Sequence, residues 1–207
     1  MTHTLHRVAN LEDFKEDYVI LVMPAKGINN DENIAEKLKK FLGIFERHNP
    51  VNLGGIGIGH LYDSKAEQII DNVYSELPMV HGVFSNREDL VAALKDIKDE
   101  DMGISIIVSG LVDSVDCCAK EAGLKRHSVN YSLGIWGDKA RLPDEKYLEI
   151  TSMCGHAMIS VNLIKKMIND VKKGIKTIEQ AAAELAKPCV CGIFNAEKAQ
   201  KILEELI

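Results

Sequence analysis

The sequence lacks the long apolar run that a transmembrane helix requires. No stretch of the 207 residues approaches 18 consecutive apolar side chains, so we expect no membrane partner. The first residues, MTHTLHRVANLEDFKED, carry charges throughout and have no apolar centre. A secretory signal would need such a centre, and we therefore expect a soluble cytoplasmic protein.

The chain also lacks an excess of basic charge. It has 25 Lys and Arg against 31 Asp and Glu, interspersed along the sequence, which gives a formal net charge of -6. This balance argues against a general nucleic-acid surface. With 46% hydrophobic residues, the chain can form one large domain or one domain with a small appendage.

Cysteine is too scarce for a protein held together by disulfides. The chain has five cysteines, an odd number, whereas secreted disulfide-rich proteins are usually shorter and richer in cysteine. In a reducing compartment these residues are free thiols, metal ligands, cluster ligands or nucleophiles.

Short apolar runs alternate with amphipathic helical stretches over the first two thirds of the chain. Strand-like runs occur at 18–25, 51–59, 79–86, 103–111 and 128–137, with helical patterns in the intervening segments. This alternation predicts an α/β fold with a mostly parallel, Rossmann-like sheet and helices on both faces.

A helical pattern continues from residue 138 to the end of the chain. We therefore expect an α/β sheet domain at 1–137 and a C-terminal helical subdomain at 138–207, packed on the sheet. Thr177 and Gln180 have the spacing of a capping box, and Asn195 can cap the last helix.

Two segments of the predicted sheet are candidates for binding a cofactor or an anion. In GGIGIGH, Gly55 and Gly57 fit the first two positions of a dinucleotide fingerprint, but His60 stands where the third glycine belongs. A tight turn after a strand explains the same glycines. In the second segment, VSGLVDSVDCC, Ser109, Gly110 and Ser114 would lie at the carboxyl edge of the sheet, where ligands bind in open α/β folds.

The second segment also contains adjacent cysteines, Cys117 and Cys118, in the predicted helix. Thiolates are favoured in the first turn of a helix, so one of the two could join a site. A buried helical cysteine can equally be a packing residue.

Cys154 and His156 form a second candidate site within TSMCGHAMIS. If a helix begins near Ser152, Cys154 lies in its first turn, where the helix dipole favours a thiolate. His156 is close enough to share the site or tune the thiol. A small core residue beside a glycine kink would also fit this pattern.

Cys189 and Cys191 form a Cys-x-Cys pair followed by Gly192. Such a turn brings two sulfurs close together and can direct backbone N–H groups at them, as zinc and iron–sulfur sites require. Two helices joined by a short turn lie antiparallel, which would bring Cys154 towards this pair. Cys154, Cys189 and Cys191 are therefore predicted metal ligands, with Cys117, Cys118, His156 or an exogenous ligand as the fourth.

The segment MCGHAMI resembles the Cys-Gly-His segment of the proline racemase and diaminopimelate epimerase type enzymes. In that family the cysteine acts as acid or base at a helix N-terminus. The match covers about seven residues. The second cysteine motif of the family lies in a distant structural half, whereas Cys189 is 35 positions after Cys154.

Three functional hypotheses follow. The first is a cysteine-ligated metal or iron–sulfur site that binds or converts a small molecule. The second is a metal-free thiol enzyme in which Cys154 and His156 are catalytic. The third is a small-ligand binding module in which the thiols pack without a chemical role. Whether the chain is an enzyme, and whether it forms a homo-oligomer, stays open at this point.

Overall fold

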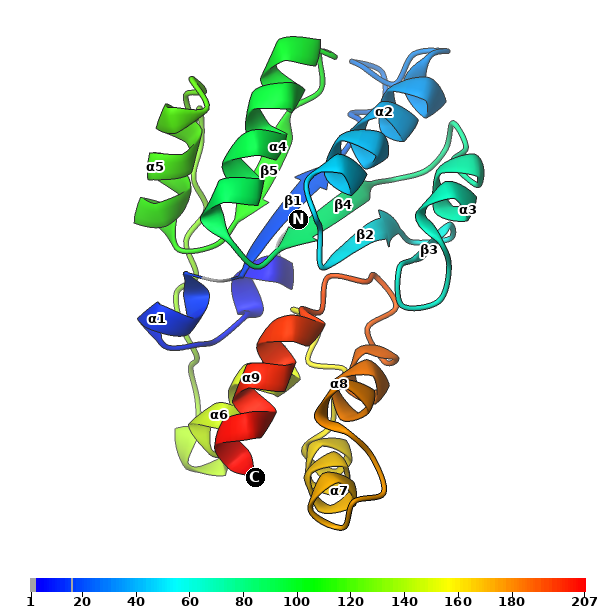
Figure 1. Cartoon of the computed structure of the whole chain (residues 1–207). Helices are drawn as coiled ribbons and strands as arrows, with labels where there is room; N and C mark the ends of the chain where they lie inside the picture. The colour runs from blue at the N-terminus through cyan, green and yellow to red at the C-terminus, as the bar shows by residue number, and fades with distance from the viewer. Residues whose placement is uncertain (1–2, 16) are drawn as a thin grey trace.

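The computed structural model describes residues 3–15 and 17–207, and it places a five-stranded sheet between two helical layers (Figure 1). The strands are β1 (Tyr18–Val22), β2 (Asn52–Gly55), β3 (Gly59–His60), β4 (Val80–Phe84) and β5 (Ile106–Ser109). The strand order is β3-β2-β4-β1-β5. Within the described residues, no helix is both long and apolar enough to cross a membrane.

The predicted parallel, Rossmann-like sheet is wrong, because every neighbouring pair of strands is antiparallel. β1 pairs with β4 on one side and with β5 on the other, and β2 pairs with β4 and β3. The α/β composition itself is confirmed. The structure also bears out four of the five strand-like runs, at 18–25, 51–59, 79–86 and 103–111.

The antiparallel order arises from two interleaved crossovers. β1 and β2 run in the same direction and are joined through α2 (Ile34–Arg47), while β4 and β5 are joined through α4 (Arg87–Glu100). β4 lies between β1 and β2, and β1 lies between β4 and β5, each antiparallel to its two neighbours. This is the split βαβ, or ferredoxin-like, arrangement. A parallel sheet and this antiparallel arrangement both produce the same alternation of strands and helices along the sequence.

The first face of the sheet is covered by helices from the first two thirds of the chain. They are α2, α3 (Ala66–Asp71), α4 and α5 (Val112–Glu121). Alternate residues of β1, Tyr18, Ile20 and Val22, contribute to the core on this face. The same core contains the apolar stripe of α2, formed by Ile34, Leu38, Phe41, Leu42 and Phe45.

The second face is covered by the C-terminal helices α6 (Glu145–Ser152), α7 (Val161–Lys172), α8 (Ile178–Ala186) and α9 (Ala196–Leu206). Val19 and Leu21 of β1 pack into this second core together with Cys154, Cys189 and Cys191. The chain also forms η1 (His3–His6), α1 (Leu11–Phe14) and η2 (Lys139–Arg141). The division into domains at 1–137 and 138–207 stays a prediction.

The helix-capping predictions in the C-terminal part are confirmed. Thr177 accepts a hydrogen bond from the backbone N–H of Gln180, whose side chain in turn accepts from Thr177 N–H. Asn195 accepts from the N–H of Lys198 at the start of α9.

The fifth predicted strand, at 128–137, is wrong. This segment has no regular secondary structure and forms part of the long connection from α5 to α6 (Figure 1). Tyr131 and Trp136 are 64% and 81% exposed. From the sequence, large aromatic side chains such as these are expected in the hydrophobic core. Phe194, by contrast, is fully buried.

Candidate functional site

Three cysteines from two separate segments meet in the core between the sheet and the C-terminal helices. Cys154 lies in the turn that follows α6, and Cys189 and Cys191 lie in the loop that follows α8. The Sγ atoms of Cys189 and Cys191 are 3.8 Å apart, and the thiol of Cys189 is hydrogen-bonded to that of Cys154. The predicted convergence of the three sulfurs is therefore seen in the structure, at one face of the sheet.

The local setting of Cys154 differs from the expected helix start. α6 ends at Ser152 and α7 begins at Val161, so Cys154 follows the C-terminal end of one helix instead of opening the next. A helix dipole at this end would disfavour a thiolate. The stabilisation of the charged sulfur must come from hydrogen bonds.

Hydrogen bonds to its sulfur lower the pKa of the Cys154 thiol to about 6. The largest contribution comes from Cys189, and burial opposes it by disfavouring the charge. The backbone N–H groups of Met158, at 3.3 Å from Sγ, and His156 contribute further. The same proton sharing raises the pKa of Cys189, which therefore keeps its proton and donates it to Cys154. Cys154 is therefore the thiolate of this pair, and Cys189 is the neutral thiol that donates to it.

His156 lies at the solvent side of the cluster. Its Nδ1 atom is 3.9 Å from Cys191 Sγ, and the residue is exposed. The three cysteines are 0–4% exposed. The cluster is therefore closed on the side of the protein core and borders solvent near His156.

Gly192 fixes the cysteine loop against two histidines of the sheet. Its φ of +76° is in the left-handed region, and a Cβ atom at this position would lie 3.0 Å from side-chain carbons of His60 and His81. Both histidines are buried. A glycine is required here by the backbone conformation and by the close approach of the two imidazoles.

Side chains of the sheet also hold the backbone of this loop. Asn52 donates from Nδ2 to the carbonyl oxygen of Gly192 at 2.5 Å, and it accepts from Leu61 N–H at 2.8 Å. Tyr62 donates to the carbonyl oxygen of Phe194 at 2.6 Å and accepts from Ala196 N–H at 3.2 Å. Burial raises the pKa of Tyr62, so its hydroxyl stays a donor.

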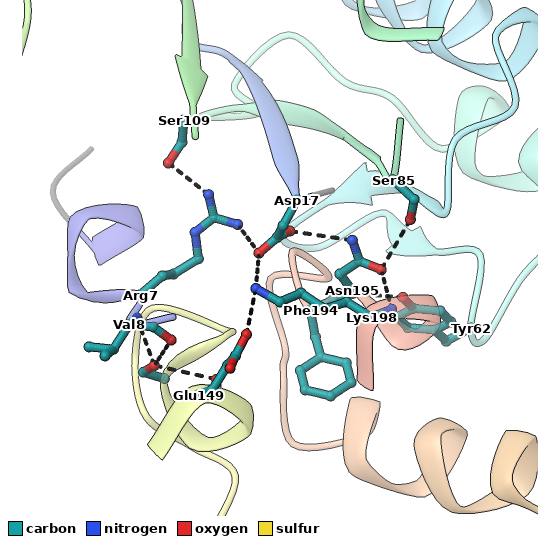
Figure 2. A network of polar contacts seen from close by, with 11 residues as sticks. Arg7, Val8, Asp17, Tyr62, Ser85, Ser109, Glu149, Phe194, Asn195 and Lys198 are labelled. Carbon is teal, nitrogen blue, oxygen red and sulfur yellow. Dashed lines mark hydrogen bonds and ion pairs between the residues drawn. The ribbon is translucent and has the colours of Figure 1, made fainter. Parts of the chain in front are cut away.

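A buried network of charges continues from this loop to the N-terminal part of the chain (Figure 2). Asp17, just before β1, accepts from Arg7 at 2.9 Å and lies 3.5 Å from Lys198 Nζ. Lys198 also pairs with Glu149 of α6 at 3.0 Å, and Asn195 donates to Asp17 at 3.3 Å. Two cations and two carboxylates balance one another, which limits the cost of burying them.

Four of the predicted site residues lie elsewhere or have structural contacts. Cys117 is exposed on α5, and its neighbour Cys118 belongs to the core on the opposite face of the sheet from Cys154. Gly55 is packed so closely that a Cβ atom would lie 2.6 Å from the carbonyl oxygen of Met79. Gly57, with φ of +93°, occupies the turn between β2 and β3.

The predicted ligand-binding residues at the end of β5 and just after it contact other side chains. Ser109 accepts a hydrogen bond from Arg7 at 3.1 Å. Ser114 lies inside α5 and shares a hydrogen bond with the hydroxyl of Tyr18 at 2.6 Å, so it does not cap the helix. A Cβ atom at Gly110 would lie 2.9 Å from the ring of Tyr18. Hydrogen bonds within the protein account for the two serines, and close packing accounts for the glycine.

Sequence reasoning missed the buried charges around the cysteine loop. A helical periodicity could have indicated Lys198, because it lies four residues before the buried Ile202 and thus on the inner face of α9. No sequence pattern of this kind indicates that Arg7 and Asp17 are buried, and both would be expected to be ordinary solvated charges near the start of the chain.

Among the residues that the structure describes, no group of three or more His, Cys, Asp or Glu side chains is arranged to hold a metal ion as it stands. No family model, curated protein or solved structure matches the chain.

Proposed function

We propose that the chain binds one thiophilic metal ion, such as zinc, through Cys154, Cys189 and Cys191, with His156 at the fourth position. The observation that carries the proposal is the meeting of three thiols from segments 35 residues apart in one buried cluster. Three cysteines and one histidine form a common ligand set of tetrahedral zinc.

The spacing of the sulfurs supports a single ion. Two thiolates bound tetrahedrally at about 2.3 Å from one zinc ion lie about 3.8 Å apart. The Sγ atoms of Cys189 and Cys191 have this separation, 3.8 Å. In a [4Fe–4S] cluster each cysteine binds a different iron atom and the sulfurs lie further apart, so such a cluster would require a wider arrangement.

The protonation of the cluster explains why the thiols hydrogen-bond to one another without metal. Metal binding requires thiolates, so the proton that Cys189 carries must be released. Cys154 is the first ligand, because its lowered pKa already favours the thiolate near neutral pH. Small rotations of the three side chains would then direct the sulfurs at one ion instead of at each other.

Burial favours a metal site over catalysis by a free thiol. A nucleophile must reach its substrate, whereas the ligands of a closed metal site need no such access. The cysteines are at most 4% exposed, and the cluster borders solvent near His156. A small molecule would bind the ion by replacing His156, which gives the predicted small-molecule partner a defined point of entry.

Metal analysis of anaerobically purified protein tests the proposal. We expect about one zinc or iron atom per chain, retained through gel filtration. Cys154→Ser, Cys189→Ser and Cys191→Ser should each reduce metal content at least tenfold. Cys117→Ser is the matched control, since this cysteine is exposed on α5 and should leave the metal content unchanged.

Two results would contradict the proposal. One is metal-free protein that takes up no zinc or iron when either metal is added to the reduced chain. The other is metal content that survives all three cysteine substitutions. Bound sulfide with about four iron atoms would replace the single ion with a cluster on the same ligands.

The lowered pKa of Cys154 favours thiol catalysis with His156 as a second candidate function. In this case, metal-free protein would react with iodoacetamide at Cys154 well below pH 8, and chelators would leave its activity intact. Retention of one metal ion with Cys154 protected from the reagent would exclude this alternative.

A further inference from the structure

A cavity of about 750 Å³ lies beside β5. Its walls are formed by β5, by parts of α4 and α5, and by residues 124–130 of the connection that follows α5 (Figure 1). The volume is within the range of about 300–1,000 Å³ that small-molecule sites have. Among the described residues, none that lines the cavity belongs to the core that contains the cysteine cluster. The cavity is therefore a separate candidate site.

The apolar part of the lining is incompletely covered. Ile106 and Val108 of β5 pack against the first core but stay partly exposed, and so do Val115 of α5 and Leu124. In the neighbouring strand β1, by contrast, every residue is buried. A ligand with an apolar body would remove these side chains from water, which is favourable.

The charged part of the lining has an excess of positive charge. With histidine taken as neutral, it has three cations and two carboxylates, namely Lys98, Lys125, Arg126, Asp101 and Asp116. The whole chain, in contrast, has a formal net charge of -6. A ligand with a single negative charge balances this excess, which favours a carboxylate over a phosphate group with its charge of about -1.5 to -2.

Two of the three cations have no carboxylate partner in the described part of the chain. Arg126 pairs with Asp116 at 3.4 Å, whereas Lys98 and Lys125 form no ion pair there. A Cβ atom at Gly123 would lie 2.8 Å from Lys98 Nζ, so this ammonium group lies just before the segment that contains Lys125. Both lysines therefore belong to the same end of the 124–130 wall.

We propose that this cavity binds a small molecule that has an apolar body and one carboxylate group. The apolar body occupies the space beside Ile106, Val108 and Leu124. The carboxylate pairs with Lys98 and Lys125 at the rim. Binding here does not depend on the proposed metal ion, because the two sites share no residue.

NMR titration of the isotope-labelled full chain with octanoate and with 1-octanol tests the proposal. The two probes have the same apolar chain and differ in the charge of the head group. Both should shift the signals of residues 103–109 and 124–130 in a saturable way. We expect octanoate to bind about fivefold more tightly than 1-octanol, because it gains two solvated ion pairs.

A double substitution of the rim lysines separates the head group from the apolar body. Lys98→Gln combined with Lys125→Gln should remove the preference for octanoate and leave the affinity for 1-octanol unchanged. Lys172→Gln combined with Lys173→Gln is the matched control, because it removes the same charge from two exposed lysines at the end of α7. The control should keep the preference.

Filling the cavity tests the place of the apolar body. Ala119→Phe adds a ring to the wall that α5 forms and should weaken both probes at least tenfold. Circular dichroism verifies the fold of this variant, and the exposed lysine pairs decide the matter if it does not fold. Absence of saturable shifts with either probe, equal affinities for the two probes, or a preference for octanoate that survives Lys98→Gln/Lys125→Gln would overturn the proposal.

Discussion

At the scale of single residues, Gly192 links the cysteine loop to the sheet. Its left-handed backbone and its contact with His60 and His81 are separate constraints, and an alanine violates both. We expect Gly192→Ala to lower the free energy of unfolding by about 2–4 kcal/mol, from about 1–2 kcal/mol of backbone strain and a similar cost of overpacking. Urea denaturation measures this change.

A substitution at a second glycine measures how much of this cost in the free energy of unfolding comes from backbone strain alone. Gly174 has a similar φ of +69°, but a Cβ atom there would meet nothing within 4 Å. Gly174→Ala should therefore cost about 1–2 kcal/mol. Equal costs for the two variants would show that the contact with the histidines does not matter.

The pKa of Cys154 makes the stability of the metal-free protein depend on pH. The folded value of about 6 is below that of an unfolded cysteine, so folding stabilises the thiolate. This stabilisation is fully present near pH 9 and is lost as the pH falls towards 6. Above pH 9 the raised pKa of Cys189 has the opposite effect.

Denaturation of the reduced, chelator-treated chain checks this dependence. We expect the free energy of unfolding to rise between pH 6 and 8.5, and the rise to be smaller in Cys154→Ser. The same slope in both proteins would show that another group causes it.

The sequence predicted the residues of the cysteine cluster but not the cause of their reactivity. The glycine-marked turns at Cys154 and Cys191, together with the antiparallel packing of two helices joined by a short turn, were sufficient to predict that the sulfurs meet. The helix dipole was the wrong cause, because α6 ends at Ser152 and Cys154 lies in the turn that Gly155, with φ of +74°, helps to form after it. The hydrogen bond from Cys189 could not be predicted before the two segments were placed together.

At the scale of elements, the buried charges connect α6, α9 and the start of β1. Lys198 bridges Asp17 and Glu149, and the three side chains are 1–5% exposed. Lys198→Met would remove the buried cation that Asp17 and Glu149 share, leaving Glu149 with the more distant Lys146 at 4.0 Å, and should cost about 3–5 kcal/mol. Lys120→Met is the control, because its pair with Asp116 is on the surface and is worth about 0.2–1 kcal/mol.

A double variant tests whether charge balance is the cause. Adding Glu149→Gln to Lys198→Met removes one carboxylate, which restores the balance of one cation and one anion around Asp17. We expect the double variant to recover about 1–2 kcal/mol relative to Lys198→Met. No recovery would indicate that packing of the lysine side chain dominates.

The direction of the strands could not be predicted from local patterns. A β-α-β rhythm fixes that β1 and β2, or β4 and β5, run in the same direction, and this holds in the structure. Whether the two strands of one β-α-β unit pair with each other, or are separated by a strand of the second unit, depends on contacts between the two units. The apolar run at 128–137 could not be excluded as a strand either, since its alternation fits one.

At the scale of the whole molecule, the proposed metal ion would join the turn after α6 to the loop after α8. Because the ion binds the folded chain, it stabilises the fold by mass action. At a free zinc concentration of about 100 times the dissociation constant, the gain is about 2.7 kcal/mol. For a chain of this size we expect the thermal midpoint to rise by about 5–10 °C.

Differential scanning calorimetry with and without zinc measures this shift. His156→Ala should keep part of it, because three sulfur ligands remain. Cys191→Ser should keep much less. An identical midpoint in zinc and in chelator would show that the ion does not bind the folded chain.

X-ray absorption at the metal edge of the zinc-loaded chain identifies the ligand atoms directly. We expect three sulfur atoms at about 2.3 Å and one nitrogen at about 2.0–2.1 Å from zinc. In His156→Ala the nitrogen should be replaced by a water oxygen or an added ligand, with all three sulfurs retained. Zinc bound by nitrogen and oxygen atoms without sulfur would contradict the proposed metal site, because the thiols of Cys154, Cys189 and Cys191 would then not hold the ion.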